Sequence, residues 1–231
     1  MVDSRSLKQR IAAGDSLNIA WGSLEMDRQT LITTLAEASY DLIFVDAQHA
    51  PCDERRLVTF CDTVDALGVP ALLRIRHTRL AFLAGNYADL GPLGILVPMV
   101  ETEDTVDEAV AQFYYPPLGK RSWGPTHGHQ RAVIQDRDAY AAWWNDHGIL
   151  ALQIETVAAV TRAAELVKPG VDLLLFGSND LAFSLATHID NPFGSIEACW
   201  AHVIAQTAGR GVRVAAGMLP YGAFGARVGE G

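Results

Sequence analysis

The chain of 231 residues is 49% hydrophobic, carries a formal net charge of −9 and has an isoelectric point near 5.2. A chain of this size and composition can bury a large core, and we expect one domain over residues 1–231. The acidic balance argues against nucleic acid or an anionic membrane surface as the main partner, because both are bound through clustered lysines and arginines.

Cysteine usage and the amino terminus indicate the compartment. Cys52, Cys61 and Cys199 are widely spaced and include no Cys-x-x-Cys pair, so the sequence suggests neither a disulfide framework nor a zinc site. The amino terminus lacks the apolar core of a signal peptide, and no apolar run approaches the roughly 20 residues of a membrane span. We therefore expect a soluble, cytoplasmic protein.

Strand-like and helix-like patterns alternate along the chain. A short opening helix ends at Gly14. The strand-like segments are residues 17–22, 41–49, 70–76, 94–100, 150–155, 172–177 and 212–218. Helical periodicity lies between them, at residues 31–38, 57–67, 80–87, 102–110, 157–167 and 199–208. This alternation predicts βαβ units in a parallel sheet.

The second strand-like segment, residues 41–49, ends in three polar residues, Asp46, Gln48 and His49. A parallel strand covered on both faces tolerates charged side chains mainly at its carboxyl end, where loops open to ligand. Asp46 alone would be explained as a turn former or helix cap. Because Asp53 stands nearer the next helix and can cap it, we predict that the three polar residues form part of a site.

Residues 114–129 interrupt the alternation with a long segment rich in proline and glycine, and such loops in compact domains are often functional. His127 and His129 suggest a metal site, but no third ligand lies nearby, which favours two solvated loop histidines. Arg121 is a candidate for contacting an anion or a subunit boundary. A plain surface position for Arg121 is an equally good interpretation.

Polar residues or a proline close most of the strand-like segments. They are Trp21, Asp46 with His49, Arg74, Pro98, Gln153 with Glu155, and residues 178–180. In a TIM (β/α)8 barrel these carboxyl ends converge on one mouth, where such enzymes place their active sites. Glu155 and Asp180, without thiols or paired histidines, suit a hard divalent ion such as Mg²⁺ or Mn²⁺. The alternative is that each of them caps the helix that follows it.

A series of motifs runs through the chain in order. It consists of Asp46-x-Gln48-His49, Arg74, Val97-Pro98-Met99-Val100, Tyr115-Pro116-Pro117-x-Gly119-x-Arg121, Gln153-Ile154-Glu155 and Gly177-x-x-Asp180-Leu181. Over about residues 15–220 this series resembles the pyruvate-aldolase/citrate-lyase (HpcH/HpaI) family, and most of all its metal-dependent class II 2-keto-acid aldolases. The resemblance implies a TIM barrel, a divalent metal ion (Mg²⁺, Mn²⁺ or Co²⁺), and reversible aldol cleavage of 4-hydroxy-2-oxo acids. The products would be pyruvate, or an analogue such as hydroxypyruvate, and an aldehyde.

The resemblance also implies roles for individual residues. Glu155 and Asp180 match the metal ligands, and Arg74 matches the arginine that faces the keto oxygen. His49 matches the catalytic histidine, and Asp46 matches the acid near it. Asp89 matches an acid that orients the histidine. The predicted substrate pocket consists of Trp21, Gln48, Gln153, Ser178 and Asn179. Met218, Leu219 and the loop at 114–131 would shape the acceptor side together with Trp21.

Two departures from the family pattern affect the pocket. Gln48 stands where the family commonly has Glu, which removes a charge beside His49. Gly177-Ser178-Asn179-Asp180 replaces a more usual Gly-Pro-Ala-Asp and adds hydrogen-bond donors. The chemistry itself needs no Schiff base, and the only lysines, Lys8, Lys120 and Lys168, lie outside the strand patterns. An imidazole can act as general base near neutral pH, and a buried structural histidine is the alternative reading of His49.

The sequence leaves three alternatives to an aldolase open, and it indicates an incomplete barrel. The same metal and enolate would serve a coenzyme A thioester lyase or an oxaloacetate decarboxylase, and a 2-oxo-acid-binding barrel without turnover is the non-enzyme alternative. Residues 220–231 contain no run apolar enough for an eighth strand, so we expect that the chain lacks a native carboxyl-terminal segment. By the resemblance we expect a homo-oligomer, typically a hexamer, with Asp89 or the 114–131 loop near a subunit boundary.

Overall fold

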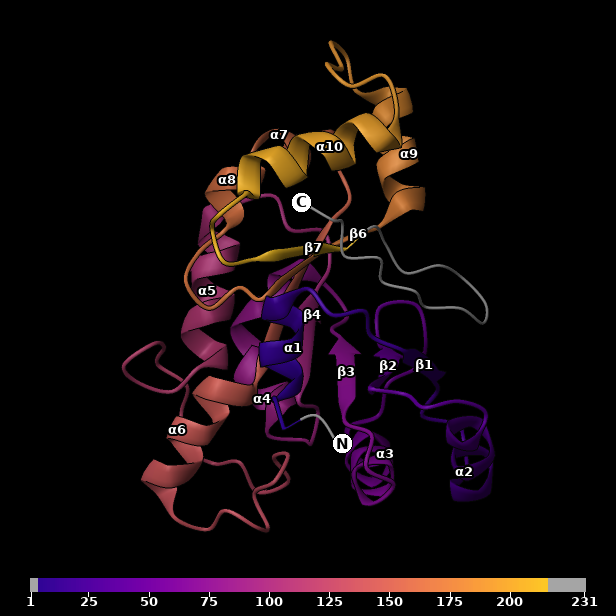
Figure 1. Cartoon of the computed structure of the whole chain (residues 1–231), viewed down its shortest axis with the longest axis vertical. Coiled ribbons are helices and arrows are strands. Elements are labelled where there is room, and N and C mark those ends of the chain that lie inside the picture. The colour runs from indigo at the N-terminus through magenta and orange to yellow at the C-terminus, as the bar shows by residue number, and fades with distance from the viewer. Residues whose placement is uncertain (1–3, 216–231) are drawn as a thin grey trace.

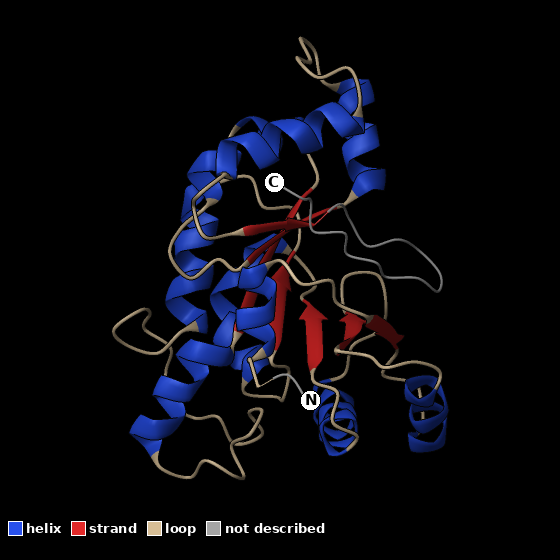
Figure 2. Cartoon of the chain, in the orientation of Figure 1, coloured by secondary structure: helices blue, strands red, loops and turns tan. Residues whose placement is uncertain are grey.

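Seven parallel strands form the centre of the structure, a computed structural model that describes residues 4–215. They are β1 (Ile19–Gly22), β2 (Leu42–Asp46), β3 (Ala71–Arg74), β4 (Gly94–Val97), β5 (Ile149–Ile154), β6 (Leu173–Phe176) and β7 (Arg213–Ala215). Each strand pairs in parallel with its sequence neighbours, so the order across the sheet is β1-β2-β3-β4-β5-β6-β7. The sheet curls, and helices lie against it (Figures 1 and 2). This confirms the predicted α/β TIM-like fold.

Within residues 4–215 the sheet ends at β1 on one side and β7 on the other. Two predictions concern residues outside the described range. They are the last residues of the predicted seventh strand, 216–218, and the expected lack of an eighth strand in residues 220–231. Among the described residues, no helix is both long and apolar enough to cross a membrane.

The helices of the outer layer begin largely where the sequence predicts. The Asp53 carboxylate caps α3 by accepting a hydrogen bond from the Arg56 N–H at 3.0 Å, and Gly14 ends α1 in the left-handed conformation, both as expected. The helices are α1 (Leu7–Ala13), α2 (Arg28–Ala36), α3 (Glu54–Ala66), the 3-10 helix η1 (Thr78–Leu83), α4 (Ala84–Ala88), α5 (Glu103–Phe113), α6 (Arg137–His147), α7 (Val157–Thr161), α8 (Ala163–Leu166), α9 (Ser178–Thr187) and α10 (Ile196–Thr207).

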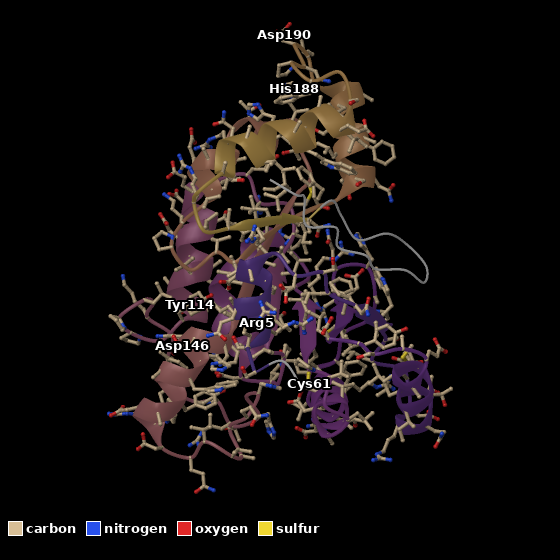
Figure 3. All side chains as sticks on the ribbon, viewed as in Figure 1. Arg5, Cys61, Tyr114, Asp146, His188 and Asp190 are labelled. Atoms are coloured by element: carbon tan, nitrogen blue, oxygen red, sulfur yellow. The ribbon has the colours of Figure 1, made fainter. Side chains whose placement is uncertain are left out.

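Several helical segments differ from the prediction. The helix expected over 80–87 is divided into the 3-10 helix η1 and α4, and the predicted helical segments did not include α9. The helix expected over 157–167 is divided at Arg162 into α7 and α8. Helix α6, which follows the irregular loop, was not predicted at all. The connection between α9 and α10 projects away from the sheet, with His188 and Asp190 at its tip (Figure 3).

The alternation of side chains along the strands produces two apolar clusters and positions the site. One cluster joins the outer face of the sheet to the helices, and the other fills the inside of the curled sheet. The inner cluster includes Phe44, Leu72, Ala151 and Leu175. Each of these four residues is followed, two positions later and on the same side of the sheet, by a residue at the strand's carboxyl end. These residues are Asp46, Arg74, Gln153 and Gly177. The apolar interior therefore ends in a polar layer at the carboxyl ends of the strands.

The opposite end of the sheet is closed by a polar network around Lys8 of α1. Its Nζ donates hydrogen bonds to Tyr114 Oη and to the Gly148 carbonyl, both at 2.9 Å, and lies 3.2 Å from Asp172 Oδ1. Burial raises the pKa of the Asp172 carboxyl, and Lys8 opposes that shift. This lysine therefore fixes α1 against the amino-terminal ends of the strands.

Candidate active site

Arg74 and Asp46 are paired across two neighbouring strands. They are register partners in β2 and β3, and the guanidinium donates from Nε to Asp46 Oδ1 at 2.9 Å and from Nη2 to Asp46 Oδ2 at 2.5 Å. Arg74 is 8% exposed, so this two-point ion pair is largely shielded from water. The pKa of Asp46 is lowered: burial raises it, but the hydrogen bonds and charge of Arg74 outweigh that effect.

A third strand completes the environment of Arg74. Its Nη1 donates to Gln153 Oε1 of β5 at 3.3 Å, and Gln153 is itself 3% exposed. Within residues 4–215, three of the five guanidinium N–H groups therefore have a partner, and one on Nη1 and one on Nη2 do not. Arg74 is therefore a fixed, buried cation that can still donate hydrogen bonds to a ligand.

Glu155 follows β5 directly and is 1% exposed. Its Oε2 accepts a hydrogen bond from the Met99 N–H at 2.7 Å, and Met99 adopts a left-handed backbone conformation with φ +49°. Its Oε1 lies against Gly177, where an added Cβ would come within 2.1 Å. Glu155 thus occupies a cradle formed by backbone atoms after β4 and β6.

The carboxylate of Asp180 is the second charge at this place. Burial, followed by the charge of Asp180 and a hydrogen bond with it, raises the pKa of Glu155 to about 7, although the Met99 N–H and Arg74 oppose the shift. Two carboxylates that repel one another fit a divalent cation, which would relieve the repulsion. Within residues 4–215 no group of three or more His, Cys, Asp or Glu side chains could hold a metal, so further ligands would come from substrate or water.

The structure also tests the capping alternative for these two acids. Thr156, not Glu155, caps α7 by accepting from the Ala159 N–H. Asp180 lies in the first turn of α9, whose cap position is Gly177, and no side chain caps that helix. Capping therefore does not account for Glu155, and Asp180 is left with the weaker benefit of an acid near a helix amino terminus.

His49 and Gln48 lie at the same end of the sheet, on the turn after β2. Asp46 Oδ1 accepts from the backbone N–H of Gln48 at 2.9 Å and of His49 at 3.4 Å. The His49 side chain is exposed, which argues against the buried structural histidine. Asp46, expected as the acid near His49, thus binds the backbone of that turn, and its carboxylate is shared between these two N–H groups and Arg74.

The expected pairing of Asp89 with His49 is not found within the described chain. Asp89 lies between α4 and β4, at the end where the strands begin, and pairs with Arg121. Arg121 is 4% exposed, with its guanidinium 4.8 Å from the Tyr115 ring centroid and 4.3 Å from that of Trp144. The interpretation of Arg121 as a plain surface residue is therefore wrong, since its guanidinium is buried against a carboxylate of its own chain. A role at a subunit boundary stays a prediction. Burial raises the pKa of Asp89, and Arg121 opposes the shift.

The remaining predicted pocket residues lie at the expected end of the sheet. Trp21, the residue before the end of β1, packs edge-on against Phe44, with 4.8 Å between ring centroids. Ser178 and Asn179 form the start of α9 beside the Glu155 cradle. Met218 and Leu219 lie outside the described residues. The sequence analysis assigned no role to Met99 or Gly177, which surround the Glu155 carboxylate. No signal in the sequence predicts the left-handed backbone of Met99. For Gly177, its position directly after a strand was the available signal.

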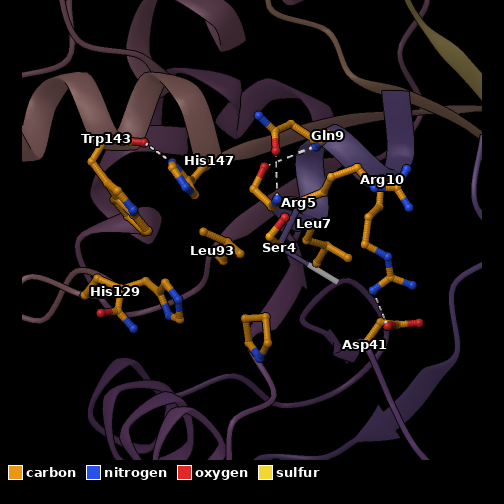
Figure 4. A pocket seen from close by; sticks show the side chains of 13 residues that line it. Ser4, Arg5, Leu7, Gln9, Arg10, Asp41, Leu93, His129, Trp143 and His147 are labelled. Atoms are coloured by element: carbon orange, nitrogen blue, oxygen red, sulfur yellow. Dashed lines mark hydrogen bonds and ion pairs between the residues drawn. The ribbon is translucent and has the colours of Figure 1, made fainter. Parts of the chain in front are cut away.

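A separate cavity of about 720 Å³ lies at the amino-terminal end of the sheet (Figure 4). Its lining includes Arg10, which pairs with Asp41 at 2.5 Å, and His129, which contacts Asp65 at 2.6 Å. His129 thus bonds a carboxylate and stacks on Trp143, so the interpretation of His127 and His129 as plain solvated histidines is wrong for His129.

The fold is of the α/β barrel class, with a buried arginine and a carboxylate pair at the carboxyl ends of its strands. The chain belongs to the HpcH/HpaI aldolase/citrate lyase family, whose model matches residues 24–219.

Named relatives support the assignment. The 2-dehydro-3,6-dideoxy-6-sulfogluconate aldolase of Pseudomonas putida is 32% identical over 68% of this chain and 61% of its own, so the chain spans about three fifths of that relative. The hydroxypyruvate/pyruvate aldolase of Roseovarius nubinhibens is 30% identical over 78% of this chain and 68% of its own. Both relatives are aldolases, which are carbon-carbon lyases.

Solved structures agree with the fold. The HpcH/HpaI aldolase from Desulfitobacterium hafniense is 25% identical, with a TM-score of 0.75 over 91% of this chain and 81% of its own. Macrophomate synthase has a TM-score of 0.74 over 90% of this chain and 75% of its own. At 21% identity the second likeness concerns the fold alone.

Proposed function

We propose that the protein is a divalent-metal-dependent aldolase that cleaves 4-hydroxy-2-oxo acids reversibly to pyruvate, or hydroxypyruvate, and an aldehyde. The observation that carries the proposal is the position of Arg74, a buried cation held by Asp46 and Gln153 at the same end of the sheet as Glu155 and Asp180. Held by Glu155 and Asp180, a cation such as Mg²⁺, Mn²⁺ or Co²⁺ would supply further positive charge to the oxygens of the oxo acid.

Arg74 stabilises the charge that cleavage creates. When the bond between C3 and C4 breaks, its electron pair moves into the enolate, and the keto oxygen becomes negative. The two Arg74 N–H groups that have no partner among the described residues can donate to that oxygen. Asp46 and Gln153 hold the guanidinium so that no reorganisation is needed. Arginine stays protonated, so it offsets the charge without giving up its proton.

We assign the proton transfer to His49. As the bond breaks, the C4 hydroxyl becomes the aldehyde carbonyl and its proton must be accepted. The imidazole of His49 is exposed on the turn after β2 and can accept it directly or through a water. No lysine competes for a covalent route. Lys8 is bound at the other end of the sheet, Lys168 pairs with Glu103, and Lys120 is exposed on the loop after α5.

The placement of the loop at 114–131 favours an aldolase over a coenzyme A thioester lyase. That lyase needs basic groups for a nucleotide tail, and this loop was the candidate for supplying them. Arg121 is instead buried beside Asp89, and Arg131 lies 5.2 Å from the Trp123 ring centroid and donates to the Ile134 carbonyl. Of the loop's lysine and arginines, this leaves the exposed Lys120 for a nucleotide tail. An oxaloacetate decarboxylase would use the same Arg74 and carboxylates, so an activity assay is needed to distinguish it from an aldolase.

Two variants test the assigned roles. Proton exchange at the methyl group of pyruvate, followed by NMR in deuterated water, requires the enolate but no aldehyde. We expect Arg74→Ala to abolish both exchange and cleavage. We expect His49→Ala to lose cleavage while still binding pyruvate and metal. Loss of pyruvate binding in His49→Ala would contradict its assignment as the base, and exchange at the wild-type rate in Arg74→Ala would contradict the whole proposal.

We further propose that the protein acts as a homo-oligomer in which Asp89 serves the His49 of a neighbouring copy. Within one chain the two residues lie at opposite ends of the sheet, while one Asp89 oxygen pairs with the buried Arg121. Co-expressed His49→Ala and Asp89→Ala chains test this, because mixed oligomers would contain sites with both residues intact. Recovery of activity is the expected result. Light scattering that gives a monomer at micromolar concentration would contradict it.

A further inference from the structure

Arg121 and Asp89 form an ion pair that is buried at one end and open at the other. The side chain of Arg121 is 1% exposed, and that of Asp89 is 21% exposed. Arg121 Nη2 donates to Asp89 Oδ1, whereas Asp89 Oδ2 has no hydrogen-bond partner within residues 4–215 and is not sealed from solvent. One oxygen of the carboxylate is therefore free to accept a hydrogen bond from another molecule.

The surroundings of Arg121 fix its guanidinium in place. The group lies 4.8 Å from the ring centroid of Tyr115 and 4.3 Å from that of Trp144. Gly85, about one helical turn before Asp89, leaves room for the side chain to pass, because a Cβ there would lie only 3.0 Å from Arg121 Cγ. The packing therefore holds the guanidinium in one orientation toward Asp89.

Stability alone does not explain this ion pair. Arg74 binds both oxygens of Asp46, but Arg121 binds one oxygen of Asp89, and its buried Nε has no partner among the described residues. A buried ion pair with unpaired N–H groups contributes little more than well-packed apolar residues would, because taking charges out of water is costly. What this geometry provides is a carboxylate with a fixed orientation and one free oxygen.

Under the proposed function Asp89 serves the His49 of a neighbouring copy, and the following inference rests on that arrangement. Within residues 4–215 the exposed imidazole of His49 has no hydrogen-bond partner for its ring. We propose that Arg121 is a positioning residue, which holds Asp89 so that Oδ2 accepts a hydrogen bond from one ring N–H of His49 in the neighbouring copy. The other ring nitrogen then accepts the proton of the C4 hydroxyl. Arg121 also opposes the rise that burial gives the pKa of Asp89, which favours the ionised carboxylate.

Single variants test whether Arg121 affects the step that His49 performs. We expect Arg121→Met to lower kcat for cleavage about 10-fold or more, with proton exchange of pyruvate and metal binding retained, because these do not need His49. Arg121→Lys keeps the cation and should lose less. Arg10→Met is the matched control: it removes an arginine that pairs with Asp41 at 2.5 Å at the same end of the sheet, and kcat should not change.

Mixed oligomers separate positioning across the subunit boundary from a structural role within one chain. When His49→Ala and Arg121→Met chains are co-expressed, about a quarter of the sites should combine an intact His49 with an intact pair of Arg121 and Asp89, if the chains mix at random in a head-to-tail contact. We expect cleavage to rise above that of either variant alone. Co-expressed Asp89→Ala and Arg121→Met chains should show no such rise, because both changes affect the same side of the contact.

The outcomes separate this inference from the function on which it rests. Absence of pyruvate proton exchange in the metal-loaded wild type would contradict the aldolase itself. If His49→Ala and Asp89→Ala chains do not restore cleavage together, the contact between copies is wrong and the inference is wrong with it. If they do, but His49→Ala and Arg121→Met chains do not, Arg121 acts only within its own chain and the inference is overturned. Should thermal denaturation show that Arg121→Met does not fold, Arg121→Lys replaces it in the same mixtures, with the same expected pattern.

Discussion

The carboxylate of Glu155 lies where any side chain at position 177 would have to be. A Cβ on Gly177 would stand 2.1 Å from Glu155 Oε1, far inside van der Waals contact. The glycine therefore holds open the space that the buried acid occupies, and together with the Met99 N–H it fixes both oxygens of the carboxylate. This contact links the loop after β6 to the residue after β5.

The first prediction follows from that contact. Gly177→Ala should displace the Glu155 carboxylate and weaken Mn²⁺ binding by about 10-fold or more, because oriented ligands and their surroundings set metal affinity. Calorimetric titration with Mn²⁺ measures the change. Gly124→Ala is the matched control and should bind metal normally, since a Cβ there would meet nothing within 4 Å among the described residues beyond its own chain neighbours. Unchanged affinity in Gly177→Ala would contradict the cradle.

A second prediction concerns the ion pair of Asp46 and Arg74. Asp46→Asn removes the counter-charge and one of the two acceptors that align the guanidinium, so pyruvate proton exchange should fall about 10²-fold. Asp53→Ala is the control: it removes the cap of α3 and should lower stability by about 1 kcal/mol with exchange retained. Equal effects of both variants on exchange would show that Asp46 has only a local structural role.

The third prediction uses the titration of Glu155. Its pKa rises from an ordinary 4.5 to about 7, so in the metal-free protein the native state holds a proton that the unfolded chain releases between these values. Stability due to this group is therefore present at low pH and is lost as pH rises through 7. Glu155→Gln mimics the protonated form. Without metal it should raise the free energy of unfolding at pH 8 by about 1–3 kcal/mol, with little effect at pH 4.

Urea denaturation of the chelated proteins at both pH values measures this difference. The same variant should lose Mn²⁺ binding at every pH, because an amide cannot replace the charge of a carboxylate ligand. A variant that is less stable than wild type at pH 8 would show that Glu155 is not strained in the metal-free site.

A fourth prediction concerns Arg121 at the other end of the barrel. Arg121→Lys keeps the charge but loses the planar group that lies against Tyr115 and Trp144, so stability should fall by about 2–4 kcal/mol. Metal affinity should not change, because the carboxylate pair is at the opposite end. Arg137→Lys, an exposed pair with Asp138 on α6, is the control and should have little effect. Loss of metal binding in Arg121→Lys would contradict this separation of the two ends.

The sequence predicted the strands and their polar ends well because both depend on local pattern. Leu42 to Val45 are buried on both faces, so they appear as one apolar run that ends at Asp46. The convergence of Asp46, Arg74 and Gln153 follows from strand order alone, since the carboxyl ends of parallel strands meet. Helix α6 was not predicted because it follows a loop rich in proline and glycine.

The partners of individual side chains could not be predicted from spacing. Asp46 and His49 are three residues apart, yet the acid pairs with Arg74, which lies 28 residues away. Asp89 and Arg121 meet only because α4 and α5 bring their ends together at the amino-terminal side of the sheet. Met99 is left-handed and its N–H binds the Glu155 carboxylate, a contact between residues 56 positions apart.

The central claim, a metal-dependent enolate stabilised by Arg74 without a covalent lysine, is tested most directly by retro-aldol turnover after exhaustive chelation. We expect cleavage of a 4-hydroxy-2-oxo acid to vanish in the dialysed protein and to return on addition of Mg²⁺, Mn²⁺ or Co²⁺. Borohydride added during turnover should trap no adduct on a lysine. Full activity in the chelated protein, or a lysine adduct found by mass spectrometry, would contradict the account.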